Sequence, residues 1–178
     1  EAIYNVNHNL KNDEDLVALE VDYEKQILCS VYSELYQPLS KCFPGLRTYH
    51  ELYYILKDHR INKLQGQVVV IAWLRGSLFI AALNNNQLIL ANNFDVKHEE
   101  ELKYFTMLVC EQLEFKNEQC TLVVLPSEIP SEIKEWFTDY FNEVVSPDLS
   151  EINMEKLSQA EQKTFLKSYV LQAALLCE

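Results

Sequence analysis

The residues best placed to bind a charged ligand form a turn between two apolar runs, Arg75-Gly76-Ser77. Glycine takes a positive φ at little cost, so such a turn can join two strands tightly. Backbone N–H groups in a turn of this kind can hold a phosphate, and neighbouring carboxylates can hold Mg²⁺. This turn supplies glycine and serine but contains neither Asp nor Glu. The turn therefore offers hydrogen-bond donors to a phosphate but no ligand to a metal ion.

Carboxylates for two-metal nuclease chemistry are missing from the strands that would have to carry them. That chemistry needs acidic side chains on a central strand, on its neighbour and on a helix, around two metal ions about 4 Å apart. The apolar runs Val68–Leu74 and Cys120–Leu125 contain no Asp or Glu. The glutamates at 99–101 are better explained as the first turn of a helix, where negative charge favours the helix dipole. The sequence therefore argues against a nuclease.

Cysteine and histidine do not form a recognisable site. Cysteine catalysis needs a thiolate beside a histidine, and Cys42 and His50 are close enough in sequence to meet. No motif surrounds either residue, so a buried cysteine and a histidine at a helix start are the preferred interpretation. A metal site from His50 and His59 is disfavoured, because nine residues place them on roughly opposite faces of a helix. We predict no catalytic residue and no metal ligand.

Periodicity predicts the elements that must position these residues. The first part of the chain is expected to contain strands at Ala2–Val6 and Leu16–Val21. A helix is expected to begin at Asp22 and to end at Pro38, because the apolar residues Ile27, Leu28, Val31 and Leu35 lie at helical spacing. A second helix is expected from Thr48 to about His59. The second part is expected to hold strands at Gln67–Leu74, Leu78–Leu83, Gln87–Phe94, Cys120–Leu125 and Val144–Val145. Helices are expected from Asp95 or His98 to Leu113, over Ser131–Phe141, and over Ser158–Cys177.

The order of these elements predicts the fold class. Short turns make the first three strands of the second part an antiparallel meander, and the chain then continues as helix, strand, helix and strand. A right-handed crossover from the third strand would place the fourth beside the first. We therefore predict an α/β protein with a mixed sheet and a ribonuclease-H-like core, the core that each half of the actin-like ATPases contains. Residues 1–65 are expected to form a partial N-terminal lobe, the remainder of a first actin-like half, and residues 66–178 a second ribonuclease-H-like half with a C-terminal helix.

Charge and composition restrict the partners. Of 178 residues, 15 are basic and 27 acidic, giving a net charge of −12. Nucleic acid is therefore not expected as a partner, because its binding depends on Lys and Arg that neutralise phosphates. No apolar run approaches the roughly 20 residues of a membrane helix. The five cysteines are odd in number, and none has the C-x-x-C spacing of a zinc or redox site. Most lie among apolar neighbours, as in Met107-Leu108-Val109-Cys110. This pattern favours a reducing compartment, and we expect a cytoplasmic protein.

One segment carries a resemblance to a known family. The run LNNNQLILANNFDVKHEEELKYFTMLVCEQL, with Phe43-Pro44 and His50 upstream and Cys177-Glu178 at the end, resembles an uncharacterised family of Bacteroidetes with a degenerate actin-like ATPase fold. This chain resembles the C-terminal two-thirds of such proteins. The resemblance implies that Arg75, Gly76 and Ser77 are remnants of a phosphate loop. It implies neither a molecular role nor a bound cofactor.

The function expected from these observations is a non-catalytic one. An acidic chain with ten Tyr residues, several of them crowded before residue 55, suits a scaffold that binds a protein partner or a second copy of itself, since Tyr is enriched at interfaces. The alternative is a nucleotide-binding actin-like ATPase whose acidic ligands come from a preceding segment. ATP and Mg²⁺ would be cofactors only under that alternative.

Overall fold

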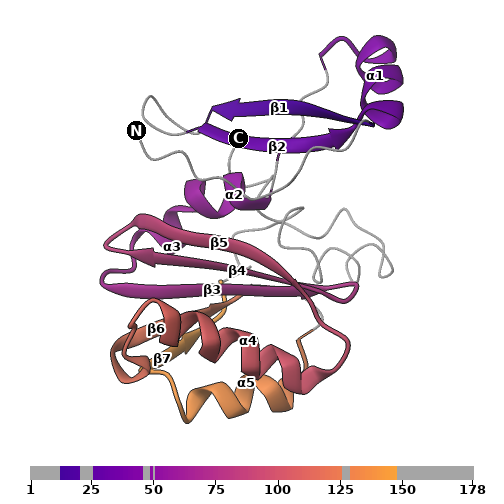
Figure 1. The fold of residues 1–178 in the computed structure, drawn as a ribbon. Coiled ribbons are helices and arrows are strands. Elements are labelled where there is room, and N and C mark those ends of the chain that lie inside the picture. Colours follow the sequence, from indigo (N-terminus) through magenta and orange to yellow (C-terminus); the bar gives the residue numbers. More distant parts are fainter. Residues whose placement is uncertain (1–12, 21–25, 46–48, 50, 126–128, 148–178) are drawn as a thin grey trace, which may run out of the picture. The chain divides into compact units, whose positions relative to one another are not determined.

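The computed structural model describes residues 13–20, 26–45, 49, 51–125 and 129–147. The chain divides into two compact units, residues 1–57 and 58–178 (Figure 1). The predicted strand over Ala2–Val6, the predicted helix over Ser158–Cys177 and His50 lie outside the described residues.

The first unit contains an antiparallel pair of strands followed by helices. Strand β1 (Glu14–Glu20) pairs with β2 (Gln26–Tyr32) from Glu14 opposite Tyr32 to Glu20 opposite Gln26. Helix α1 (Ser33–Cys42) and helix α2 (Glu51–Lys57) follow. The predicted strand at 16–21 is thus confirmed within a residue or two, and Leu52 and Ile55 of α2 are buried as expected.

The prediction of a helix from Asp22 to Pro38 is wrong. Residues 26–32 form β2, and the helix begins only at Ser33 and continues through Pro38 to Cys42. The apolar spacing of this short run fits both a helix and a strand. Pairing with β1, together with β-branched and aromatic residues such as Ile27, decides for the strand. Pro38 removes one helical hydrogen bond without ending α1, since the N–H of Phe43 still donates to the carbonyl of Leu39 at 2.8 Å.

The second unit is built on a five-stranded mixed sheet. Its strands are β3 (Gln67–Leu74), β4 (Ser77–Asn84), β5 (Gln87–Asp95), β6 (Cys120–Val124) and β7 (Glu143–Val145). They lie in the order β5-β4-β3-β6-β7. The pairs β3–β4 and β4–β5 are antiparallel, whereas β3–β6 and β6–β7 are parallel. The fourth strand therefore lies beside the first, as the crossover rule predicts, and the meander and its following elements are confirmed.

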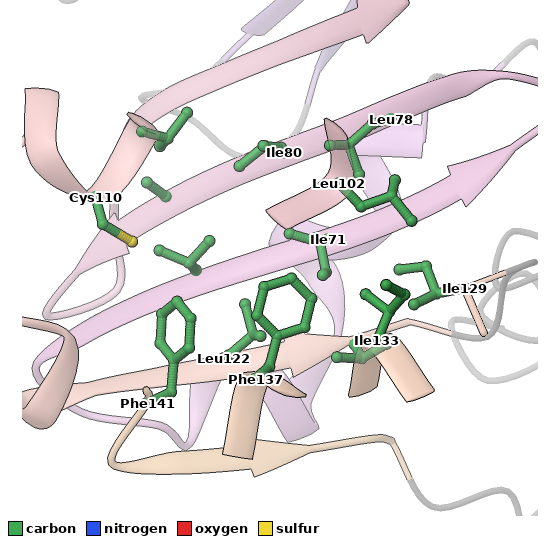
Figure 2. Close-up of a cluster of buried hydrophobic side chains, with 14 of the residues drawn as sticks. Ile71, Leu78, Ile80, Leu102, Cys110, Leu122, Ile129, Ile133, Phe137 and Phe141 are labelled. Carbon is green, nitrogen blue, oxygen red and sulfur yellow. The ribbon is translucent and has the colours of Figure 1, made fainter. Parts of the chain in front are cut away.

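Helices α4 (Glu99–Gln112) and α5 (Ser131–Thr138) cover one face of this sheet (Figure 1). The helices contribute Leu102, Val109, Ile133 and Phe137 to the core under them. Alternate strand positions contribute Val69, Ile71, Leu78, Ile80, Leu122 and Val124, and Figure 2 shows how Ile71, Leu78 and Ile80 lie among these side chains. Burial of this apolar surface is the main stabilising contribution of the unit.

The opposite face of the sheet is buried as well. Val68, Val70 and Val123 are at most 2% exposed, and so are Ala81 and Leu83 on β4. A strand with both faces buried needs apolar residues at every position, not at alternate ones. This explains why β3 reads QVVVIAWL instead of alternating with polar residues.

Two short helical segments complete the second unit. Helix α3 (His59–Asn62) follows α2 after a single residue, Asp58. The helix predicted from Thr48 to about His59 therefore ends at Lys57, and α3 is a second short helix that was not predicted. A 3₁₀ turn, η1 (Asn117–Gln119), leads into β6. Asp58 separates α3 from α2 because its carboxylate accepts the backbone N–H of Arg60 at 2.9 Å, which caps a new helix start.

Helix α4 ends in a Schellman turn that contains a strained residue. The N–H of Phe115 donates to the carbonyl of Cys110 at 2.8 Å and that of Glu114 to Glu111 at 3.1 Å. Glu114, at the position that usually holds glycine, has φ 56°. A side chain in this left-handed conformation costs about 1 kcal/mol, and a negative charge at a helix C-terminus is unfavourable.

Substituting Glu114→Gly is therefore expected to stabilise the second unit by about 0.5–1 kcal/mol. The urea midpoint, followed by tryptophan fluorescence, measures the change. Glu114→Ala is the control, because it removes the charge and keeps the Cβ. An alanine variant as stable as the glycine variant would show that backbone conformation contributes nothing.

Candidate functional site

The turn between β3 and β4 is the structural position of the predicted phosphate-loop remnant. Arg75 and Gly76 form a two-residue turn with φ 53° and φ 79°, and Ser77 is the first residue of β4. Positive φ at both central residues defines a type I′ hairpin, in which glycine is favoured. The carbonyl of Gly76 accepts a hydrogen bond from the N–H of Val96 at 2.8 Å. This bond links the turn to the residue that directly follows β5. The assignment of these three residues as phosphate-binding stays a prediction.

Sequence reasoning overlooked one carboxylate beside this turn. Asp95 ends β5 directly opposite Ser77 in the β4–β5 ladder, so an acidic residue and a hydroxyl share one edge of the sheet. The turn itself contains no acid, and only strand register reveals the neighbour. Counting residues back from the Asn85-Asn86 turn would have placed Phe94 opposite Ser77, because the pairing shifts by one residue between Ala82 and Leu83. Asp95 alone does not make a metal site: in the described parts of the chain, no group of three or more His, Cys, Asp or Glu side chains could hold a metal ion.

Trp73 brings an unusual polar atom to the same end of β3. Its ring packs against the core cluster, and its indole Nε1 is buried with no hydrogen-bond partner among the described residues. A buried donor without an acceptor costs stability. Trp73 pairs with Leu78 across the hairpin, so this donor lies two residues from the turn.

The glutamates at 99–101 occupy the first turn of α4, as predicted. The carboxylate of Glu101 accepts the backbone N–H groups of Lys97 at 2.6 Å and His98 at 3.3 Å. These hydrogen bonds, with smaller contributions from the charges of His98 and Lys97, lower the pKa of Glu101 below its ordinary value of 4.5. Glu101 therefore caps the N-terminus of α4. This structural role explains the glutamates here without a function as metal ligands of a nuclease.

The cap predicts a pH dependence. A carboxyl whose pKa is lowered by folding stabilises the folded state above its unfolded pKa, and that stability is lost as the pH falls through the folded pKa. The midpoint difference between the native protein and Glu101→Gln is therefore expected to be largest at neutral pH and to shrink in acid. Urea unfolding over a pH series measures it. Glu100→Gln is the matched control, since Glu100 neighbours Glu101 and is exposed. The same pH trend in both variants would contradict the role of Glu101.

The cysteines and histidines considered for catalysis do not come together as a described site. Cys42 is exposed at the last position of α1, whereas the sequence suggested a buried residue. Its proposed partner, His50, is outside the described residues, so the pairing stays untested. Cys110 and Cys120 are buried in the core of the second unit.

Four of the exposed large hydrophobic side chains among the described residues lie on α1 or directly beside its ends. Tyr32, Leu35, Leu39 and Phe43 are 55%, 65%, 46% and 60% exposed. Their spacing of three or four residues places them along one side of the helix. Helix α1, which is described in full, buries none of its residues. We call these four residues the α1 stripe. The sequence pointed to tyrosines in this region, but it placed Leu35 in a core-facing position and so missed the stripe.

The other N-terminal tyrosines behave differently. Tyr49, Tyr53 and Tyr54 pack on one another with ring centroids 4.7–5.6 Å apart. Tyr54 is 8% exposed. Aromatic rings packed in this way stabilise the local structure, so these three residues form a packing cluster, and the α1 stripe remains the better candidate for contact with another molecule.

Comparison with solved structures identifies the class of fold. The chain is similar to a protein of Bacteroides thetaiotaomicron described as having an actin-like ATPase fold and unknown function, with a TM-score of 0.75 and 19% sequence identity over 97% of this chain. The match covers 62% of that protein, so the chain spans less than two-thirds of its length. At this identity the likeness establishes the fold alone, and it confirms the predicted actin-like, ribonuclease-H-like core.

The family is established by sequence. Residues 1–145 match the family described as "Protein of unknown function (DUF3822)", and the chain belongs to it. The predicted resemblance to an uncharacterised family with this fold is thereby confirmed. Archaeoglobus fulgidus Pelota, matched over 95% of this chain and 50% of its own at 12% identity, has a TM-score of only 0.32. Curated protein sequences give no match.

Proposed function

We propose that this chain is a non-catalytic protein-interaction module on an actin-like fold. The exposed α1 stripe is the observation that carries the proposal. Four large apolar or aromatic side chains, each about half exposed, form a surface of the kind that mediates protein contacts. An acidic chain that has no membrane-spanning helix among its described residues is better suited to a protein partner in the cytoplasm than to nucleic acid or an anionic membrane.

The chemistry of the β3–β4 turn supports the non-catalytic side of this proposal. Nucleotide hydrolysis on this fold needs carboxylates that hold Mg²⁺ near the phosphates. The turn offers Arg75, Gly76 and Ser77, and its nearest carboxylate in the ladder is the single Asp95. The alternative, a nucleotide-dependent ATPase, would require acidic ligands from elsewhere in a longer protein.

Site-specific photo-crosslinking in the native cell tests the interaction. A photo-reactive phenylalanine analogue at Leu39 is expected to give discrete adducts that disappear when Leu35→Glu is added. The same analogue at Lys41, on the other side of α1, is the matched control and should give none. Because α1 buries no residue, both substitutions should leave the unfolding midpoint nearly unchanged. Adducts of equal yield at both positions would overturn the proposal.

Calorimetry of the full-length protein with Mg-ATP addresses the alternative, because that alternative takes its acidic ligands from outside this chain. We expect no saturable heat. Saturable binding that is weakened by Asp95→Asn would overturn the non-catalytic assignment and place the nucleotide at the β3–β4 turn.

A further inference from the structure

The side-chain amide of Asn117 has an incomplete set of hydrogen bonds. Its Nδ2 donates to the sulfur of Met107 at 3.7 Å, and its Oδ1 is buried with no hydrogen-bond partner among the described residues. A thioether sulfur is a weak acceptor, so this bond satisfies the donor poorly. Because a buried polar atom without a partner costs stability, the stability of the fold does not explain why an amide lies here.

The backbone around Asn117 fixes the amide beside the sulfur. Asn117 is the first residue of η1, and its carbonyl accepts a hydrogen bond from the N–H of Asn142 at 3.0 Å. The N–H of Lys116 donates to Oε1 of Gln67 at 3.0 Å. Met107 lies on α4, where its half-buried side chain packs against the core cluster. The donor and the sulfur are therefore held together by two different elements of the second unit.

We propose that Met107 is a site of reversible oxidation by hydrogen peroxide, and that the amide of Asn117 holds the sulfoxide product within the folded structure. A lone pair of the sulfur attacks one peroxide oxygen, the O–O bond breaks, and the departing hydroxide takes the proton from the transferred oxygen. The sulfur loses two electrons, and the peroxide becomes the sulfoxide oxygen and one water. A methionine sulfoxide reductase reverses the reaction with two thiols, which become a disulfide while the oxygen leaves as water.

The amide changes the cost of this modification. A sulfoxide placed against an apolar core normally disrupts it, because its polar oxygen is buried without a donor. Here Nδ2 of Asn117 exchanges a weak thioether acceptor for the sulfoxide oxygen, which accepts hydrogen bonds much better. The oxidised chain therefore stays folded, and the pair forms an oxidant-sensitive contact between α4 and η1.

Peptide mapping of the intact chain after treatment with hydrogen peroxide tests the site. Cleavage after lysine places Met107 in fragment 104–116 and the other methionine, Met154, in fragment 135–156. We expect fragment 104–116 to gain one oxygen atom, which a methionine sulfoxide reductase removes from the fragment. Dithiothreitol alone should not remove it, and this distinguishes the sulfoxide from a sulfenic acid on Cys110 of the same fragment.

Melting temperatures test the role of the amide. Asn117→Leu removes the donor, and Met107→Leu is the matched control that reports the effect of oxidation elsewhere in the chain. After subtraction of that effect, oxidation is expected to lower the melting temperature of Asn117→Leu by about 2–4 °C more than that of the native chain. This is the shift that one ordinary hydrogen bond produces in a chain of this length.

Two results with the native chain would overturn the proposal. One is a fragment 104–116 without added oxygen at a peroxide concentration that fully oxidises the same fragment in the urea-unfolded chain. The other is the loss of a cooperative melting transition once Met107 is oxidised. Equal shifts in the native chain and in Asn117→Leu would overturn the role of the amide. The first two results hold even where a variant does not fold.

Discussion

Replacing Phe137 with alanine is expected to destabilise the second unit by about 3–5 kcal/mol, the range observed for removing a fully buried aromatic side chain. Phe137 is 0% exposed. Its ring lies edge-on to Phe141 at 5.8 Å and to Trp136 at 5.4 Å. The substitution removes the hydrophobic contribution of the ring and leaves a cavity between α5 and the sheet that close packing prevents from collapsing fully.

Tryptophan fluorescence is a selective measurement of this effect. The chain has two Trp, Trp73 and Trp136, and both belong to the second unit, so urea unfolding followed by fluorescence reports on that unit. Glu135→Ala, on the exposed side of the same helix, should change the midpoint by no more than about 0.5 kcal/mol. A Phe137→Ala variant within 1 kcal/mol of the native protein would mean that α5 is not packed on the sheet as described.

Removing the carboxylate of Asp58 is expected to cost about 3 kcal/mol, towards the lower end for breaking a buried ion pair by removal of one partner. The side chain of Arg60 donates to the Asp58 carboxylate from Nε, to Oδ1 at 2.9 Å and to Oδ2 at 3.3 Å, and from Nη2 to Oδ2 at 2.7 Å. The side chains are 3% and 15% exposed. Asp58→Ala leaves a guanidinium poorly solvated and deletes the cap of α3, whereas an exposed pair would be worth much less.

A double-mutant cycle separates these contributions. Asp58→Ala, Arg60→Ala and the double variant are compared by urea unfolding. We expect the double variant to lose less stability than the sum of the two single losses, because the ion pair can be removed only once. Asp58→Asn keeps an acceptor for the N–H of Arg60 and should recover the capping part of the loss. Strict additivity of the two alanine substitutions would show that the ion pair contributes nothing to stability.

The sequence predicted the second unit well because its signals are local and agree with one another. The apolar runs of β3, β4 and β6, bounded by glycine, asparagine and proline, exclude any other assignment, and the crossover rule then fixes the strand order. The first unit was harder to predict because its signals compete. The apolar spacing around Ile27 fits two structures, and Pro38 suggests a helix end that α1 passes through. Only the pairing of β1 with β2 decides between them.

The candidate functional residues likewise differ in how far the sequence could locate them. Arg75, Gly76 and Ser77 could be located from the sequence because a turn is a local feature. Asp95 could not be placed beside Ser77 without the register of β4 and β5. The α1 stripe was missed because the solvent exposure of its side chains depends on which other parts of the chain pack against α1. The types of the residues in the stripe do not show this.

The position of β6 between β3 and β7 has a consequence for synthesis on the ribosome. β3, β4 and β5 are joined by two-residue turns and can pair as soon as they emerge. The other edge of β3 finds its partner only when Cys120–Val124 has been made, more than fifty residues after Gln67. Until then an apolar strand presents unpaired backbone groups, which is the condition that favours pairing with another chain. Early folding of the meander therefore creates a period of aggregation risk that ends only when the crossover is complete.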